Sequence, residues 1–266
     1  MHSREYIDKQ IKEMNIPDGA IVLMHTSLRA IGKIDGGAEV LLDLLVENIT
    51  SRGGVFCVPT HTWDNLFLEC DTLDLGKKES CLGAFPNIAL ADSRGIRSCN
   101  PTHSIVAFGD EKRINELIKD ELFIDTPTAP NSFYGKLCQP NAYVLLVGVG
   151  QNSNTYLHSV EEMLDFPNRM VDERTPVSVR YSDGRVEHRS MRMFDESVHG
   201  DVSEKFYRYE PAFRHFDAIE DFRIGDAAVQ LCSTVRIKEA MTVMTNRSEL
   251  RDPLAHGDVI PECLYL

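Results

Sequence analysis

Residues 143–164 constrain the fold of this chain most strongly, because they join an apolar run to a glycine turn and then to a helical pattern. Residues 143–147 are apolar and are followed by Gly148 and Gly150. A short apolar run that ends at glycine predicts a buried strand. After a polar stretch, Thr155 is a good N-cap type, and the apolar residues behind it recur at helical spacing. The segment therefore predicts a buried strand, a sharp turn and a helix.

The same alternation occurs earlier in the chain. Residues 20–24 form an unbroken apolar run, residues 40–49 carry apolar side chains at helical spacing, and residues 55–58 form the next apolar run. A strand–helix–strand order is typical of a parallel sheet with right-handed crossovers. Residues 105–108 predict one more strand and residues 112–122 one more helix. We therefore expect an α/β fold with a mainly parallel central sheet flanked by helices.

The C-terminal third of the chain carries a different pattern. Apolar residues alternate with polar ones from Val177 to Tyr181, and Asp183 and Gly184 then provide a tight turn. This pattern predicts an added antiparallel hairpin. No linker, repeat or low-complexity segment interrupts the sequence, so residues 1–266 are expected to form a single domain.

Composition and charge argue against several classes of protein. The net charge of −13 disfavours nucleic acid as a partner, because a phosphate-binding face must be basic, and it suits a cationic substrate. No apolar run approaches the roughly 18 residues of a membrane span, and the N-terminus lacks an apolar signal segment. The seven cysteines form no C-x-x-C pair, which argues against a zinc ribbon. We expect a cytoplasmic protein that binds neither nucleic acid nor a membrane.

His158 is the first candidate for chemistry, because it falls in the first turn of the helix predicted after residues 143–147. Open α/β sheets bind their ligands outside the carboxyl ends of their strands. Glu161 and Glu162 follow at helical spacing, so either carboxylate can reach the imidazole, fix its tautomer and raise its basicity. This arrangement favours a general base. The alternative is a structural histidine beside two solvated glutamates. His158 and Glu161 could also form a metal-binding pair, but no third ligand lies at a recognisable spacing.

Two loops supply further polar groups. His25, Thr26 and Ser27 follow the apolar run 20–24 and precede a helix, a place that suits an anionic cofactor, although a plain strand-to-helix turn fits equally well. Residues 97–104 supply one arginine, several hydroxyls and His103. His103 competes with His158 as the base and ranks second, because a loop histidine before a strand more often has a structural or cofactor-facing role.

Several familiar motifs are absent. Gly148 and Gly150 begin a dinucleotide-binding pattern, but Ser153 stands at the position of its third glycine. Neither a Walker loop nor the G-x-S-x-G turn of a serine hydrolase occurs. The two glycines are therefore interpreted as a sharp turn beside a ligand.

Taken together, the ordered motifs resemble the aminoglycoside N3-acetyltransferase family, which is unrelated in fold to the GCN5-type acetyltransferases. The matching pieces run in the family's order over residues 20–165, and the C-terminal third is similar only loosely. These pieces are residues 25–32 with Gly36 and Gly37; Arg97, Ser98, Pro101 and Ser104; Asp125, Thr126, Pro127, Ser132 and Tyr134; and residues 146–150 followed by Asn154, Thr155, His158 and Glu161.

The resemblance implies acetyl-CoA as the acetyl donor, the 3-amino group of a 2-deoxystreptamine aminoglycoside as the acceptor, and no metal. It implies that His158 is the general base and Glu161 the acid that supports it. Acceptor-binding acids are expected at Asp64, Glu162 and Asp201. Asn100 departs from the histidine that many relatives carry before the proline. The expected cofactor-binding residues are His25, Thr26, Ser27, Leu28, Arg29, Gly32, Lys33, Arg97, Ser98, Thr102, His103 and Ser104.

We expect direct transfer within a ternary complex, because no cysteine is placed convincingly for an acyl-enzyme. Antibiotic resistance is the expected role, and a homodimer is compatible with it. Backbone N–H groups near Ser27 or Gly148 are expected to receive the thioester oxyanion. The same chemistry on another amine, such as an amino sugar or a biosynthetic amino compound, is the alternative. A CoA-binding relative without catalysis and a thioester hydrolase also stay open.

Overall fold

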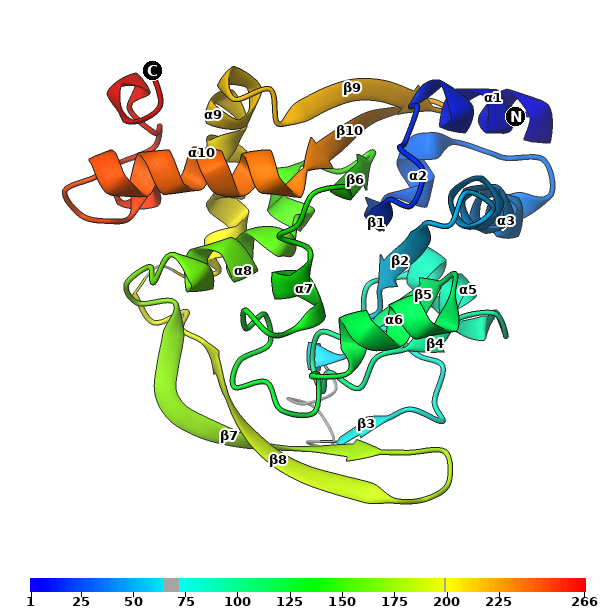
Figure 1. Cartoon of the computed structure of the whole chain (residues 1–266), viewed down its shortest axis with the longest axis horizontal. Helices are drawn as coiled ribbons and strands as arrows, with labels where there is room; N and C mark the ends of the chain where they lie inside the picture. Colours follow the sequence, from blue (N-terminus) through cyan, green and yellow to red (C-terminus); the bar gives the residue numbers. More distant parts are fainter. Residues whose placement is uncertain (65–71, 199) are drawn as a thin grey trace.

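The computed structural model describes residues 1–64, 72–198 and 200–266. Within these residues, the larger sheet has seven strands in the order β4-β5-β2-β1-β6-β10-β9 (Figure 1). At its centre, β1 (Ile21–Thr26) pairs in parallel with both β2 (Val55–Pro59) and β6 (Ala142–Val147). Each outer strand pairs antiparallel with its inner neighbour; these strands are β5 (Ile105–Phe108), β4 (Ile96–Arg97), β10 (Ala227–Ser233) and β9 (Ile219–Ile224). The predicted α/β class is confirmed, and its parallel strands form the centre of the sheet.

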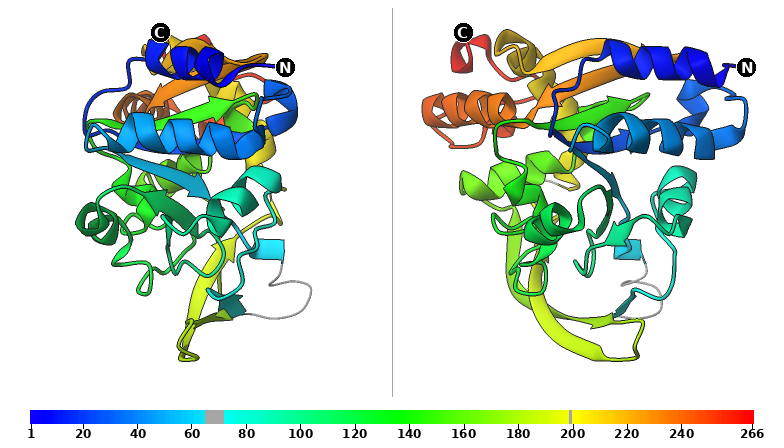
Figure 2. Two further views of the ribbon diagram at one scale, coloured as in Figure 1. Left: turned by 90° about the vertical axis from the view of Figure 1, so that its right-hand side faces the viewer. Right: turned by 45° about the vertical axis from the view of Figure 1, so that its right-hand side comes forward.

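Helices cover both faces of this sheet, which explains why its central strands are unbroken apolar runs (Figure 2). Val22 of β1 lies in the core shared with α1 (Arg4–Glu13) and α3 (Gly37–Thr50). The next residue, Leu23, lies in the opposite core with α8 (Tyr156–Met163) and α10 (Thr234–Arg247). Successive side chains of a strand point to opposite faces of the sheet, so β1 contributes to both cores.

Shorter helices lie between the strands or, at the C-terminal end, after α10. They are α2 (Leu28–Ile31), α5 (Ala84–Ala91), α6 (Glu111–Ile118), α7 (Phe133–Lys136) and α9 (Glu210–His215), with the 3₁₀ helices η1 (Gln151–Ser153), η2 (Val202–Tyr209), η3 (Pro253–Ala255) and η4 (Glu262–Leu264). None of the helices in the described part of the chain is long and apolar enough to cross a membrane. The cysteines in that part are free thiols, and Cys70 lies outside it.

The predicted antiparallel hairpin is present. It consists of β7 (Met170–Arg180) and β8 (Val186–Phe194), and β3 (Thr72–Asp74) pairs in parallel with β7 to complete a second sheet. The hairpin curves away from the main sheet (Figures 1 and 2). Its last residue, Phe194, lies beside His158 of α8, with ring centroids 4.5 Å apart. The hairpin therefore contributes one wall to the region around the predicted base.

Gly148 shows why the turn after β6 needs glycine. Its φ angle is +65°, a conformation that side chains with a Cβ rarely adopt. A Cβ at this position would lie 2.3 Å from the Cβ of Ala30 and 3.3 Å from that of Ala227. The turn thus packs directly between α2 and β10, and it leads the chain into η1 and α8.

Candidate active site

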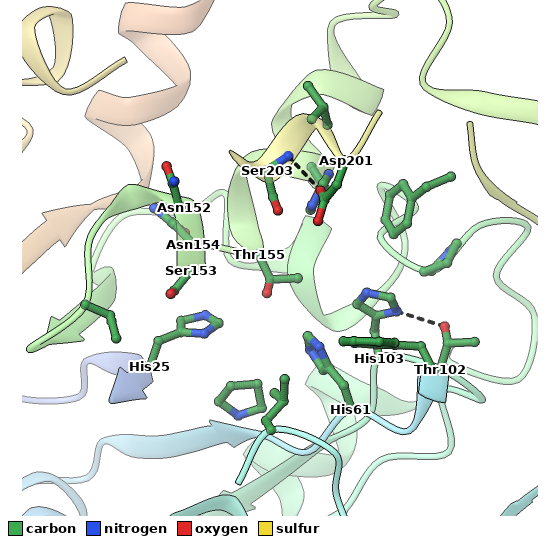
Figure 3. Close-up of a pocket in the computed structure, with 18 of the residues that line it drawn as sticks. His25, His61, Thr102, His103, Asn152, Ser153, Asn154, Thr155, Asp201 and Ser203 are labelled. Atoms are coloured by element: carbon green, nitrogen blue, oxygen red, sulfur yellow. Dashed lines mark hydrogen bonds between the residues drawn. The ribbon is translucent and has the colours of Figure 1, made fainter. Parts of the chain in front are cut away.

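A cavity of about 450 Å³ opens beyond the carboxyl ends of β1 and β2. Its described walls include the ends of these strands, the segment after β2, the start of α5, the loop before β5, η1 and the start of α8. The end of β8 and the residues around the start of η2 also belong to them. Figure 3 shows side chains from these separate segments converging on one space. This is the place where open α/β sheets bind ligands.

His158 lines the cavity from the first turn of α8, as the sequence predicts. Its ring packs between Phe194, at 4.5 Å, and Phe206, at 4.8 Å. Burial lowers the pKa of His158 to about 4; nearby Asp201 raises the pKa and Arg169 lowers it further. The imidazole is therefore neutral at pH 7 and can accept a proton.

The predicted contact between Glu161 and His158 is not formed. The Glu161 carboxylate accepts hydrogen bonds from Arg169 Nε at 2.8 Å and Nη2 at 3.2 Å, and from the Tyr209 hydroxyl at 3.2 Å. Arg169 also donates to Asp252 at 2.9 Å. Burial raises the pKa of Glu161, and the Arg169 guanidinium opposes that shift. A buried carboxylate requires a cation, so the prediction that Glu161 orients His158 is wrong.

The predicted acceptor acids separate into different environments. Asp201 lines the cavity, and its carboxylate accepts a hydrogen bond from the backbone N–H of Ser203 at 2.9 Å (Figure 3). Glu162 lies outside the cavity, because the hydroxyls of Thr126 and Thr128 hold its carboxylate. Its carboxylate therefore binds the loop that carries these two threonines and does not line the cavity, and its role in substrate binding stays a prediction.

Other acids surround the cavity or lie near it. Asp64 is exposed and is not among the described residues that line the cavity. Asp195 and Glu196 do line it, and sequence reasoning missed both. Their only signal was their position just after the predicted return strand of the hairpin.

Some of the predicted cofactor-binding residues line the cavity, and others lie outside it. Within the described chain, four of them line the cavity: His25, Thr26, Thr102 and His103. The others lie outside it: Ser27, Leu28, Arg29, Gly32, Lys33, Arg97, Ser98 and Ser104. Ser27 instead caps α2 by accepting the Ala30 N–H at 3.4 Å.

Arg97, Ser98 and Ser104 are occupied by internal contacts. Arg97 donates to the carbonyls of Lys77, at 2.8 Å, and of Thr60 and Glu79. The Ser104 hydroxyl donates to the Thr60 carbonyl at 2.8 Å, and Ser98 accepts the Ile105 N–H. Their polar atoms therefore hold the segments around β2 and β5 together, and their assignment to the cofactor stays a prediction.

Unpartnered polar atoms mark one side of the cavity. His25 Nε2, Thr26 Oγ1 and Asn154 Oδ1 have no hydrogen-bond partner among the described residues. His25 is 7% exposed, and burial lowers its pKa to about 3, so its ring is neutral. Leaving a buried polar group unpaired costs about 1–3 kcal/mol. Residues that bear such a cost at a cavity wall are candidate ligand contacts.

His61 is a site residue that sequence reasoning missed. It lines the cavity with its ring centroid 4.3 Å from that of His103, and its Nε2 lies 2.8 Å from the Tyr134 hydroxyl. Burial lowers the pKa of His61 well below its usual value, and the neighbouring histidines act in the same direction. No sequence spacing relates His61 to His158, and only the fold brings them to one cavity.

The backbone N–H groups expected to bind the oxyanion are already engaged. The Ser27 N–H donates to the Val147 carbonyl at 2.9 Å, and the Gly148 N–H donates to the Ala228 carbonyl at 2.8 Å. That expectation is therefore wrong for these two groups. In residues 1–64, 72–198 and 200–266, no three histidine, cysteine or acidic side chains gather as a metal site.

Comparisons with known proteins agree on one family. A model of the aminoglycoside 3-N-acetyltransferase family matches residues 23–246. The SPbeta prophage-derived aminoglycoside N(3')-acetyltransferase-like protein YokD of Bacillus subtilis is 22% identical over 90% of this chain and 89% of its own length. Aminoglycoside N(3)-acetyltransferase IX of Micromonospora chalcea is 27% identical over 66% of this chain and 68% of its own. A solved binary complex of AAC-IIIb with CoASH has a TM-score of 0.75 at 19% identity, covering 90% of this chain and 94% of that one.

Proposed function

This chain belongs to the aminoglycoside 3-N-acetyltransferase family, and we propose that it transfers the acetyl group of acetyl-CoA to the 3-amino group of a 2-deoxystreptamine aminoglycoside. The observation that carries the proposal is the neutral His158, which faces a cavity beyond the carboxyl ends of the central strands. This is the arrangement that a general base for acyl transfer requires.

The donor side of the proposed site is the wall with unpartnered polar atoms. The pantetheine arm of CoA carries amide N–H and carbonyl groups. Asn154 Oδ1 accepts hydrogen bonds, so an amide N–H of that arm suits it, and His25 and Thr26 offer further polar atoms. AAC-IIIb, a protein of the same fold, has been solved in a binary complex with CoASH, which supports CoA as the donor.

The acceptor side is the acidic rim formed by Asp195, Glu196 and Asp201. Aminoglycosides carry several ammonium groups, so a rim of carboxylates in a chain of net charge −13 favours their approach. The other two predicted acids do not line the cavity: Glu162 is bound to Thr126 and Thr128, and Asp64 is exposed outside it.

The proposed mechanism uses His158 as the base in direct transfer. An alkyl ammonium with a pKa of about 10 is neutral in roughly one part in a thousand at pH 7, and only the neutral amine attacks. Attack on the thioester carbon leaves a positive charge on nitrogen, and His158 takes the proton from that nitrogen. A positioned base contributes roughly 100- to 10,000-fold.

Asp201 replaces Glu161 as the acid that supports the base. It is the nearby acid that raises the pKa of His158, so it stabilises the imidazolium that forms during transfer. Glu161 instead fixes α8 through Arg169. We therefore expect replacement of Asp201 to lower turnover, and replacement of Glu161 to lower the stability of the fold.

Thiol release tests the proposal. The protein is incubated with acetyl-CoA and a panel of 2-deoxystreptamine aminoglycosides, and free CoA is measured with and without the acceptor. We expect acceptor-dependent release and a 3-N-acetylated product. Thiol release without any amine would identify a hydrolase. Acetylation of other amines, with aminoglycosides unchanged, would assign the enzyme to a different substrate class. CoA binding without acetyl transfer would identify a non-catalytic relative. For the proposed role in resistance, expression in a susceptible bacterium should raise the inhibitory concentration of the acetylated drug.

A further inference from the structure

Acetyl transfer places negative charge on the thioester oxygen, and this charge needs a hydrogen-bond donor. The backbone N–H groups of Ser27 and Gly148 are committed to Val147 and Ala228. We propose that His61 fills this role by donating a hydrogen bond from Nδ1 to the thioester oxygen of bound acetyl-CoA. This inference rests on the proposed function.

The tautomer of His61 follows from its partner. Tyr134 is fully buried, and its hydroxyl proton needs an acceptor. Within the described residues, the acceptor that it meets is His61 Nε2, at 2.8 Å. If the tyrosine donates to Nε2, that nitrogen carries no proton. A neutral imidazole then carries its proton on Nδ1.

The position of His61 fits the role. Figure 3 shows His61 extending into the cavity between His25 and His103. Among the described residues, no side chain or backbone group bonds to its Nδ1. A chain of ring contacts leads from His61 to His103 at 4.3 Å, from His103 to Phe194 at 5.4 Å, and from Phe194 to His158 at 4.5 Å. The donor and the base thus border one reaction space.

The surroundings keep this donor neutral. Burial is the largest cause that lowers the pKa of His61, and the neighbouring His103, His25 and His158 act in the same direction. A neutral imidazole N–H in a buried site can polarise a carbonyl without moving its own proton. Because Tyr134 and His103 hold the ring before the substrate binds, no reorganisation is needed as charge develops.

The transfer step balances with this assignment. The amine lone pair forms the C–N bond, and the carbonyl π pair moves to oxygen, where the His61 N–H stabilises it. His158 takes one proton from nitrogen. The oxygen pair then re-forms the carbonyl, the C–S bond breaks with its pair on sulfur, and the thiolate receives the proton from His158.

Two substitutions separate the functions of the ring. His61→Gln places an acceptor near the Nε2 position for Tyr134 but leaves no donor at the Nδ1 position. His61→Asn places an amide donor near the Nδ1 position and loses the tyrosine contact. We expect His61→Gln to lower kcat by about 100- to 1,000-fold while the affinity for acetyl-CoA stays within about threefold of wild type. The kcat of His61→Asn should be at least about tenfold higher than that of His61→Gln.

The infrared carbonyl band of bound [1-¹³C]acetyl-CoA reports the hydrogen bond without turnover. We expect the band to shift to lower frequency in the wild-type complex and to return toward its position in water in His61→Gln. Thr155→Val tests a competing donor, because Thr155 is one of the hydroxyl side chains that line the cavity. If Thr155→Val, and not His61→Gln, removes the shift, the inference is overturned.

The ¹⁵N spectrum of wild-type histidines keeps the inference testable if the variants fail to fold. We expect the proton of His61 on Nδ1, and a proton on Nε2 would overturn the inference. Failure of the proposed function has a different signature, namely a wild-type protein that neither binds nor uses acetyl-CoA. Wild-type turnover with a His61→Gln kcat within about threefold would overturn the inference alone.

Discussion

Replacing Arg169 with methionine tests the buried charge cluster that holds α8, the helix that carries His158. Arg169 is 6% exposed and bonds to Glu161 and Asp252, whose exposures are 1% and 2%. Arg169→Met preserves much of the apolar volume but leaves two buried carboxylates without their cation. Loss of one partner from a buried ion pair costs about 3–5 kcal/mol. We therefore expect the free energy of unfolding to fall by about 4 kcal/mol at pH 7.5.

The loss should depend on pH in a defined direction. Without the guanidinium, burial and the nearby Asp252 raise the pKa of Glu161 and only the Tyr209 hydrogen bond opposes them, so its folded-state pKa lies above the unfolded value. A group with a raised folded pKa stabilises the fold at low pH, and this stability is lost as pH rises through that pKa. The difference between wild type and Arg169→Met should therefore grow from pH 5.5 to pH 8.

Urea unfolding followed by circular dichroism measures both effects, and Arg214→Met provides a matched control. Arg214 also bridges two acids, Glu210 at 2.8 Å and Asp221 at 2.7 Å, but its side chain is 42% exposed. Exposed pairs contribute about 0–1 kcal/mol, so the control should lose less than about 1 kcal/mol. A loss below about 1 kcal/mol for Arg169→Met at pH 7.5, or one that does not change with pH, would refute the reasoning.

Three further predictions concern Gly148 in the turn after β6, Asp201 near His158, and the buried His25. Gly148→Ala should lower the free energy of unfolding in urea by about 2 kcal/mol or more, because the new Cβ meets Ala30 at 2.3 Å; an unchanged midpoint would count against the packing described. Asp201→Asn should lower kcat/KM for the aminoglycoside about tenfold in steady-state assays, since the imidazolium loses its counter-charge, and a wild-type value would remove Asp201 from the mechanism. His25 has a folded-state pKa of about 3, below its unfolded value near 6.5, so unfolding takes up a proton as pH falls. Between pH 7.5 and pH 5, the free energy of unfolding of the wild type should therefore fall by about 2 kcal/mol more than that of His25→Asn. Equal losses would contradict the burial of a neutral ring.

The fold was largely predictable, because its signals are local. Residues 20–24 and 143–147 are apolar throughout, since strands buried on both faces leave no polar position. Asp183 and Gly184 give the hairpin turn, and Gly148 gives the turn that presents α8. The antiparallel pairing of the outer strands carries no comparable signal, because strand direction depends on how distant segments meet.

The site was predictable only in part. The position of His158 at the cavity was predictable, because its place after a strand is a local feature. The partner of Glu161 was not, because helical spacing says which residues are within reach but not which cation a buried carboxylate meets. Arg169 connects Glu161 to Asp252, which lies 83 residues further along the chain. His61 and Tyr134 are 73 residues apart, and only the folded chain brings them together.

A single-turnover assay of His158→Ala tests the central claim most directly. Wild type and variant are mixed with saturating acetyl-CoA and aminoglycoside, and both binding affinities are measured by calorimetry. The account predicts that acetyl transfer falls by about 100- to 10,000-fold while both affinities stay within about threefold of wild type. His103→Ala serves as the comparison, because His103 lines the same cavity. Transfer by His158→Ala within about tenfold of wild type, together with its loss in His103→Ala, would contradict the account and assign the base to His103.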